Sequence, residues 1–288
     1  MLTPDQIEFY RKNGYLGVEG VFTSQQVDEL RRVTDEFVEI SRQVTENDPV
    51  FDLEPDHTPE APKLRRLKSP TKQHPVYDRA LRNETLLDIV GQLIGPGVCY
   101  NGDKLNMKLP EFGSPVEWHQ DWAFYPHTND DLLAVGVALD DMTTENGCLL
   151  VIPGSHRGKI YDHHQDGCFV GAVTEEDFSD EGAAQVQVKA GGVSIHHVRA
   201  LHASLPNASD KPRRLLLLQY CAADSWPVFP GADWEKYSDT FLRGEPAQAI
   251  RTEHVPIRLP LPPALRPGSI YENQTVLAHT TFKSVAAV

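Results

Sequence analysis

The stretch that decides the fold of this chain is residues 116–122, which read VEWHQDW. His119 and Asp121 are two positions apart in it, and the composition of the stretch predicts a β-strand. Side chains at positions i and i+2 of a strand point the same way, so one imidazole and one carboxylate converge on a single point. Two polar side chains on one face add little to packing, which indicates a binding function.

A third candidate ligand, His202, follows about 80 residues later. Two imidazoles and one carboxylate form the facial triad that is associated with non-haem Fe(II) oxygenases, in which three coordination positions stay open. His196 and His197 are local alternatives to His202. They are neighbours on a predicted strand and therefore point to opposite sides, and we interpret His197 as a residue that supports a ligand or packs in the core.

These motifs resemble the phytanoyl-CoA dioxygenase family of Fe(II)/2-oxoglutarate-dependent oxygenases. Residues 119–126, with HQD followed by a Tyr-Pro turn, are similar to the family's metal-binding strand. Residues 145–156 are similar to its glycine-containing central hairpin, and residues 202–213 to its distal segment, with an arginine eleven positions after the histidine. Residues 5–16 resemble the family's opening. The resemblance covers about residues 3–224, and nothing comparable is found in the last 60 or so.

The resemblance implies that His119, Asp121 and His202 bind Fe(II). It also implies that Arg213 and Ser204 hold the 5-carboxylate of the cosubstrate 2-oxoglutarate. The spacing of eleven residues to Arg213 favours His202 over its neighbours as the distal ligand. A guanidinium group presents a planar fork that pairs with both oxygens of a carboxylate, which lysine does not reproduce.

Arg214 follows Arg213 directly. Strand alternation turns only one of the pair inward, so Arg214 is expected on the surface.

Two further polar positions are candidates for the cosubstrate pocket. Lys104 or Asn106, on the strand before the His-x-Asp strand, is expected to complete the 2-oxoglutarate site.

A basic segment over residues 63–72 follows an acidic, proline-rich segment over residues 43–62. Such an acidic composition forms a core poorly and predicts a solvated loop, while a mobile lid over the site is the alternative, because long loops in compact domains are often functional. The basic segment is either a solvated surface run or a source of one or two pocket residues. Lys68 is the most favoured of these for binding 2-oxoglutarate or a substrate carboxylate.

The predicted elements are helices first and strands afterwards. Capping boxes at Thr3 and Thr23 open two helices, and a third is predicted over residues 83–93. Short strands are then predicted over seven ranges, namely 98–109, 115–121, 132–139, 147–152, 184–189, 192–197 and 213–221. This order indicates an α+β chain built on an antiparallel jelly roll or barrel, and the resemblance implies the cupin-like double-stranded β-helix.

We therefore expect one oxygenase domain over residues 1–288. Its parts are a mainly helical region over residues 1–95, a jelly-roll core over residues 96–224 and an irregular C-terminal wrap over residues 225–288. A chain of 288 residues buries an ample core without disulfides or a structural metal.

Composition excludes several classes of partner. The net charge of −14 disfavours nucleic acid and anionic membrane surfaces. The four cysteines lack the spacing of a disulfide framework, and we find no signal peptide and no apolar run of the roughly 18 residues that a membrane span requires. We expect a cytoplasmic monomer or homodimer with a small-molecule substrate.

The implied activity is hydroxylation of an aliphatic C–H bond of a small metabolite, with Fe(II), 2-oxoglutarate and O2 as cofactors and cosubstrates. Succinate and CO2 are the co-products, and ascorbate is the expected activator in vitro. Desaturation, epoxidation or rearrangement of a natural product with the same cofactors is an alternative. A non-catalytic jelly-roll binding protein is a second alternative, and a cupin-type enzyme without a 2-oxo acid, which would give Arg213 no role, is a third.

Overall fold

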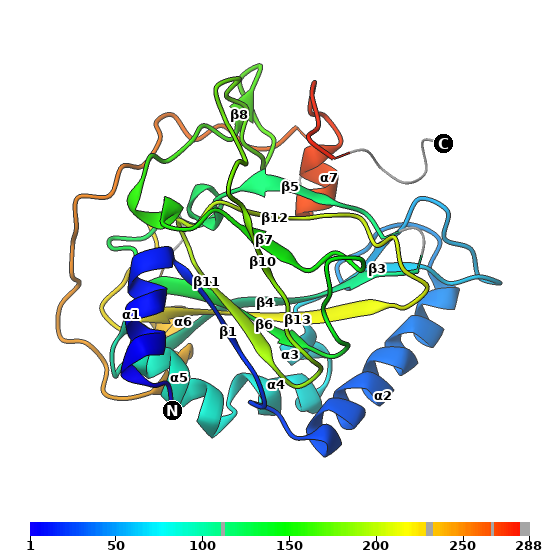
Figure 1. Ribbon diagram of the computed structural model, residues 1–288, viewed down its shortest axis with the longest axis horizontal. Helices are drawn as coiled ribbons and strands as arrows, with labels where there is room; N and C mark the ends of the chain where they lie inside the picture. Colours follow the sequence, from blue (N-terminus) through cyan, green and yellow to red (C-terminus); the bar gives the residue numbers. More distant parts are fainter. Residues whose placement is uncertain (111–112, 229–232, 266–267, 283–288) are drawn as a thin grey trace.

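The computed structural model describes residues 1–110, 113–228, 233–265 and 268–282. Helices dominate the first third of the chain, and two antiparallel sheets form the remainder of the core (Figure 1). Within the described ranges, no helix is both long enough and apolar enough to cross a membrane.

The N-terminal helices begin and end where the sequence predicts. Helix α1 (Pro4–Asn13) and helix α2 (Ser24–Ile40) each begin with a complete capping box, formed by Thr3 and by Thr23. Gly14 ends α1 in the left-handed conformation, with φ of 78°, which glycine adopts without steric cost. The predicted third helix is α5 (Glu84–Ile94). Two short helices were not predicted, α3 (Pro70–Gln73) and α4 (Pro75–Leu81).

The larger sheet has eight strands. Its order is β1 (Tyr15–Val18), β11 (Val193–His197), β6 (Leu132–Ala138), β13 (Arg213–Ala222), β4 (Val98–Lys108), β3 (Leu64–Lys68) and β2 (Phe51–Leu53), with β14 (Phe241–Arg243) also paired to β4. The smaller sheet has the order β10 (Ala184–Val186), β7 (Leu149–Val151), β12 (His202–Ser204) and β5 (Val116–His119). A separate hairpin joins β8 (His164–Gln165) to β9 (Cys168–Phe169). All seven predicted strands are present, and the jelly-roll prediction is confirmed.

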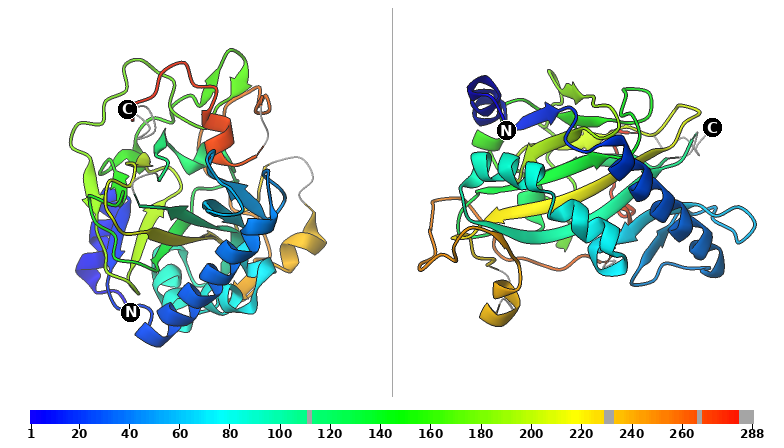
Figure 2. Two further views of the ribbon diagram at one scale, coloured as in Figure 1. Left: turned by 90° about the vertical axis from the view of Figure 1, so that its right-hand side faces the viewer. Right: turned by 90° about the horizontal axis from the view of Figure 1, so that it is seen from below.

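Strand alternation divides the larger sheet into two faces. Along β13, Leu216 and Leu218 belong to the main hydrophobic core, which they share with residues of α2, α4 and α5. These helices cover the outer face of the sheet, and the smaller sheet lies across the other face (Figures 1 and 2). The inward residues of β13 begin with Arg213 and end with Gln219, so the space between the two sheets is lined partly by polar groups.

The acidic segment over residues 43–62 is not wholly a solvated loop, so that prediction is wrong for its centre. Phe51 and Leu53 are buried in β2, which pairs with β3. Asp52 is fully buried because Arg65 of β3 donates to its Oδ1 atom at 2.6 Å. A buried charge needs such a partner, and the basic segment that follows supplies it. Residues 51–53 are therefore a sheet edge rather than a lid.

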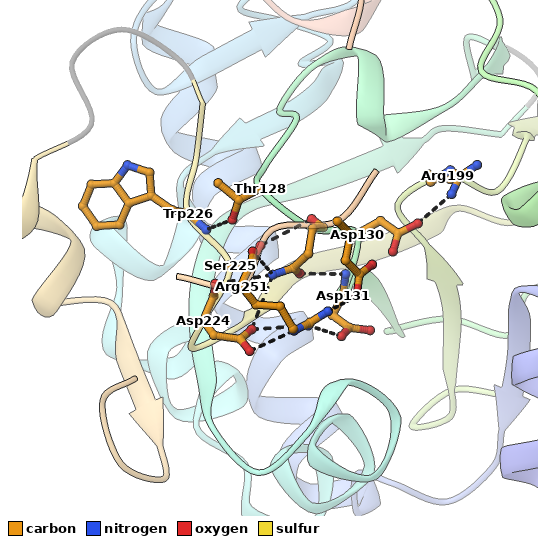
Figure 3. A network of polar contacts seen from close by, with 10 residues as sticks. Thr128, Asp130, Asp131, Arg199, Asp224, Ser225, Trp226 and Arg251 are labelled. Atoms are coloured by element: carbon orange, nitrogen blue, oxygen red, sulfur yellow. Dashed lines mark hydrogen bonds and ion pairs between the residues drawn. The ribbon is translucent and has the colours of Figure 1, made fainter. Parts of the chain in front are cut away.

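The C-terminal wrap over residues 225–288 contains, within its described part, two short helices, α6 (Trp234–Ser238) and α7 (Ile270–Gln274), and the strand β14. It runs around the outside of the sheets and returns to β5 (Figure 1). Arg251 fixes this path, because it donates to Asp224 at 2.9 Å and also pairs with Asp131 near the start of β6 (Figure 3).

Candidate metal centre

His119, Asp121 and His202 come together between the two sheets. His119 ends β5 and lies opposite His202, the first residue of β12. The Oδ1 atom of Asp121 is 3.7 Å from Nε2 of His119 and 4.0 Å from Nε2 of His202. Their ligand atoms all lie within 4.8 Å of one another, and all three residues are buried.

The sequence predicted that Asp121 lies on the strand itself, but in the structure it lies just beyond the strand. Strand β5 ends at His119, and Asp121 is the first residue of a 3₁₀ turn, η2 (Asp121–Ala123). Gln120 between them stays extended, with φ of −118° and ψ of 127°. The side chains at positions 119 and 121 therefore still point the same way, and the expected convergence occurs.

Hydrogen bonds prepare both imidazoles to bind a metal. Nδ1 of His119 is 2.8 Å from the carbonyl oxygen of Glu117, and Nδ1 of His202 is 2.9 Å from that of Ala200. A carbonyl oxygen only accepts, so each Nδ1 carries the proton and each Nε2 presents a lone pair to the cluster. Burial lowers the pKa of His119 to about 4 and that of His202 well below its usual value. Both rings are neutral at pH 7, as metal ligation requires, so these residues fit an Fe(II) site.

A third imidazole, His196, lies beside the cluster. Its Nε2 atom is 3.4 Å from Oδ2 of Asp121, and its ring centroid is 4.1 Å from that of His202. Burial acts to raise the pKa of Asp121, but the neighbouring His196, His202 and Lys104 hold it well below its usual value. His197 points away from the cluster and packs against His156. The sequence shows that the two neighbours diverge, but not which of them faces inward.

Residues between the two sheets enclose a pocket around the cluster. It is lined by β4, β6, β11 and β13 of the larger sheet, by β5, β7 and β12 of the smaller sheet and by α7. The empty space within the lining is about 610 Å³, its open mouth included.

Arg213 and Ser204 form the end of the pocket away from the cluster. Nη2 of Arg213 donates to the carbonyl oxygen of Gly147 at 2.9 Å, while its buried Nε atom has no partner in the described chain. The hydroxyl of Ser204 likewise has no partner among the described residues. Arg214 points to the opposite face and pairs with Asp140, as alternation predicts. The inward arginine thus keeps donors available for an anion.

Lys104 and Asn106 both line the pocket from β4. Nε of Arg66 donates to Oδ1 of Asn106 at 2.9 Å, and this bond leaves the amide nitrogen of Asn106 available as a donor. Contrary to the prediction, Lys68 lies outside the lining, because its ammonium group donates to the carbonyl oxygen of Asp48 at 2.8 Å. Of the basic segment, Arg66 contacts a pocket residue instead.

The sequence reasoning missed Ile270 and Tyr271, which line the pocket from α7. The ring of Tyr271 lies against two guanidinium groups, with its centroid 4.6 Å from Cζ of Arg65 and 5.2 Å from Cζ of Arg66. A signal was present, because Ser269 and Glu272 form a capping box, which marks a helix start. Nothing local to that helix indicates that it returns to the metal cluster.

Two other histidines, His163 and His127, are buried near this region. Nε2 of His163 accepts the backbone N–H of Gln120 at 2.8 Å. It therefore supports the chain between the two ligands of the His-x-Asp motif. His127 is also buried, but it lies against Pro227 and does not line the pocket.

His163 gives a prediction for the pH dependence of stability. Burial lowers its pKa to about 3, whereas an unfolded histidine has a pKa of about 6.5. The unfolded chain therefore binds the proton more readily, and the contribution of His163 is complete above pH 6.5 and is lost as the pH falls towards 3. Urea unfolding of the metal-free protein should show about 2 kcal/mol less stability at pH 5 than at pH 7 from this residue. A His163→Gln variant should lose less over the same interval, and an equal loss would contradict the assignment.

With this geometry in place, comparison with known proteins identifies the family. Residues 10–215 match the family model described as phytanoyl-CoA dioxygenase (PhyH). The chain belongs to the phytanoyl-CoA dioxygenase family. The match runs from the end of α1 to the first residues of β13 and includes all three residues of the cluster.

Several PhyH-family relatives have named activities. A probable alpha-ketoglutarate-dependent hypophosphite dioxygenase from Stutzerimonas stutzeri is 32% identical, with 95% of this chain and 97% of that protein covered. An ectoine dioxygenase from Sphingopyxis alaskensis is 27% identical, with 88% and 86% covered. The crystal structure of EctD from S. alaskensis with bound Fe has a TM-score of 0.68 and 25% identity, and covers 88% of this chain and 87% of that one.

These findings establish the class of enzyme. The protein is an Fe(II)/2-oxoglutarate-dependent dioxygenase with a jelly-roll core, and its cofactors are iron and 2-oxoglutarate. Its relatives act on small molecules.

Proposed function

We propose that His119, Asp121 and His202 bind the iron of this dioxygenase and that Arg213, with Ser204, binds the 5-carboxylate of 2-oxoglutarate. The observation that carries the proposal is that the buried cluster and the partly unpaired guanidinium group face the same pocket. A cosubstrate with a carboxylate at each end fits between a metal and an arginine. When bound, iron with 2-oxoglutarate and O2 supplies oxidative decarboxylation to succinate and CO2, coupled to hydroxylation.

The chain itself orients these groups and excludes water. The carbonyl oxygens of Glu117 and Ala200 fix both imidazoles, so the metal ligands need no reorganisation on binding. The carbonyl oxygen of Gly147 accepts a hydrogen bond from Nη2 of Arg213. Nε of the same guanidinium group remains unpaired, and the side chain lines the pocket. Such a fixed fork pairs with a carboxylate through two hydrogen bonds.

We further propose that the substrate is a small free metabolite rather than a CoA ester. The pocket between the two sheets must hold 2-oxoglutarate as well as the substrate. The relative named for hypophosphite matches along nearly its whole length, and further relatives are named for L-proline and ectoine. All of these are compact compounds. The C-terminal wrap contributes Ile270 and Tyr271 to the lining and is our proposed determinant of substrate size.

The test is spectroscopic and catalytic. Anaerobic addition of Fe(II) and 2-oxoglutarate to the protein is expected to produce the visible charge-transfer absorption of a chelated 2-oxo acid. Admission of O2 with ascorbate should then release succinate slowly without any added substrate. No absorption band and no succinate, in a protein that binds Fe(II), would overturn the proposal. Fe(II) binding without any effect of 2-oxoglutarate would favour the binding-protein alternative.

A further inference from the structure

Lys104 is a pocket-lining cation without a partner. Among the described residues, none accepts a hydrogen bond from its ammonium group or forms an ion pair with it. The other cations around the pocket each have at least one hydrogen-bond partner. Arg66 donates to Asn106, Arg213 to the carbonyl oxygen of Gly147, and Lys108 to the carbonyl oxygens of Ser114 and Leu205. Lys104 is only partly shielded from water, so its unpaired ammonium group is available to an anionic ligand that enters the pocket.

Lys104 and Arg213 lie at different ends of the pocket. In the pairing of β4 with β13, Lys104 is opposite Leu217, whereas Arg213 is opposite Lys108. Four residues of strand separate the two levels, about 13 Å at the usual rise of roughly 3.3 Å per residue. Gln219, the next inward residue of β13 after Leu217, is opposite Ala134 of β6, and Ala134 is opposite His196 of β11. Nε2 of His196 is 3.4 Å from Oδ2 of Asp121. Lys104 therefore belongs to the metal end.

The charges of the loaded site leave Lys104 uncompensated. Fe(II) carries two positive charges and Arg213 carries one, while Asp121 and the two carboxylates of 2-oxoglutarate carry three negative charges. These positive and negative charges sum to zero without the charge of Lys104. The loaded enzyme consequently has one positive charge more than its own groups neutralise at the metal end.

Resting on the function proposed above, we propose that Lys104 binds the anionic group of the prime substrate. The substrate is then a compact compound that carries a carboxylate, phosphonate or phosphinate group, and the bond that is oxidised is on the atom that bears this group or on the next atom. This short separation follows from the position of Lys104 at the metal end of the pocket. The role differs from the cosubstrate contact that the sequence suggested for this lysine.

Neighbouring groups complete a polar subsite around Lys104. Gln219 lines the same end of the pocket, and its Nε2 atom donates to the hydroxyl of Tyr125 at 2.6 Å. This bond directs the side-chain oxygen of Gln219 away from Tyr125 and towards Gly102, where a Cβ atom would lie only 2.8 Å from it. The absence of a side chain at position 102 therefore leaves room for Gln219. His196 faces the same space, with Nδ1 lacking a hydrogen-bond partner in the described chain and Nε2 3.4 Å from Oδ2 of Asp121.

The reaction balances with the cosubstrates of the class. Substrate–H, 2-oxoglutarate and O2 give substrate–OH, succinate and CO2. One oxygen atom enters the broken C–H or P–H bond, and the other enters the new carboxylate of succinate. The anion on Lys104 takes no part in electron transfer, and its role is to hold the reacting bond in place.

The experiment is a calorimetric titration of the wild-type enzyme, loaded anaerobically with Fe(II) and 2-oxoglutarate so that binding is measured without turnover. The probes are hypophosphite, methylphosphonate and propionate, with propanamide as the neutral comparison. We expect at least one of the anions to bind and the neutral propanamide not to bind. In Lys104→Met the affinity for that anion should fall about 100-fold, and in Lys104→Arg it should be partly restored. Lys12→Met removes an equal charge from an exposed position and should leave the affinity unchanged.

Two parallel readouts separate this inference from the proposed function. The charge-transfer absorption and the Kd of 2-oxoglutarate should change less than twofold in Lys104→Met, and its Tm should not fall. A large rise in the Kd of 2-oxoglutarate would show that Lys104 binds the cosubstrate and would overturn the inference. Equal anion binding by wild type and Lys104→Met, or no binding of any anion by wild type, would also overturn it. Failure of the wild type to bind 2-oxoglutarate at all would instead refute the proposed function.

Discussion

Replacement of His119 by alanine is expected to lower 2-oxoglutarate-dependent succinate formation at least about 1,000-fold, because the iron chemistry is the source of nearly all the rate. His119 supplies one of three ligand atoms that lie within 4.8 Å of one another, and two ligands hold a metal loosely. Iron content after desalting should fall together with activity. Both quantities are measured on the same sample, by metal analysis and by succinate release.

The matched control is His197→Ala. His197 is also a histidine of the jelly roll, but it packs against His156 and away from the cluster. This variant is expected to retain stoichiometric iron, although its Tm should fall because a packed side chain is removed. If His119→Ala kept its iron and its turnover, the metal would be bound elsewhere. If both variants lost iron equally, the loss would reflect general destabilisation rather than ligation.

Replacement of Arg213 by alanine is expected to raise the KM for 2-oxoglutarate about 100-fold or more while iron binding stays unchanged. Removing one partner of a buried, hydrogen-bonded charge pair costs roughly 2–5 kcal/mol, and each 1.4 kcal/mol is a factor of ten in affinity. Arg213→Lys should recover only part of the loss, because an ammonium group cannot form the two parallel hydrogen bonds of guanidinium. Steady-state kinetics with varied 2-oxoglutarate measures both effects.

Arg214→Ala provides the control for Arg213, since the two residues are adjacent and carry the same charge. Arg214 pairs with Asp140 at 2.8 Å and with Asp35 at 2.6 Å on the other face of the sheet. The variant should therefore lower the Tm and leave the KM for 2-oxoglutarate within about twofold. An unchanged KM in Arg213→Ala would favour the cupin-type alternative, in which no 2-oxo acid is bound.

Local signals account for most of what the sequence predicted. Hydrogen bonds between residues three apart determine the starts of α1 and α2, so Thr3 and Thr23 are recognisable without tertiary information. The strand β13 is long and rich in apolar residues, which makes its existence equally local. Alternation also separates Arg213 from Arg214, because it depends only on the two-residue period of a strand.

What could not be predicted depends on contacts between distant segments. Composition predicted a solvated loop around Asp52. The partner of Asp52 is Arg65 of the next strand, which neutralises the buried carboxylate inside the sheet. Choosing between His196 and His197 required the register of β11 against β6, which places His196 opposite Ala134. Tyr271 reaches the pocket only because the C-terminal wrap is fixed around the sheets, and no pattern within α7 encodes that path.

The position of Tyr271 has a consequence for biosynthesis. The ribosome completes the metal cluster when it adds His202 and the pocket end when it adds Arg213, yet the ring that packs on Arg65 and Arg66 is added about 50 residues after Gln219. A nascent chain therefore holds its iron ligands before it has a closed pocket. An open iron site could oxidise the nascent chain itself. This reaction is avoided if 2-oxoglutarate binds productively only after α7 has been translated and has packed against the pocket.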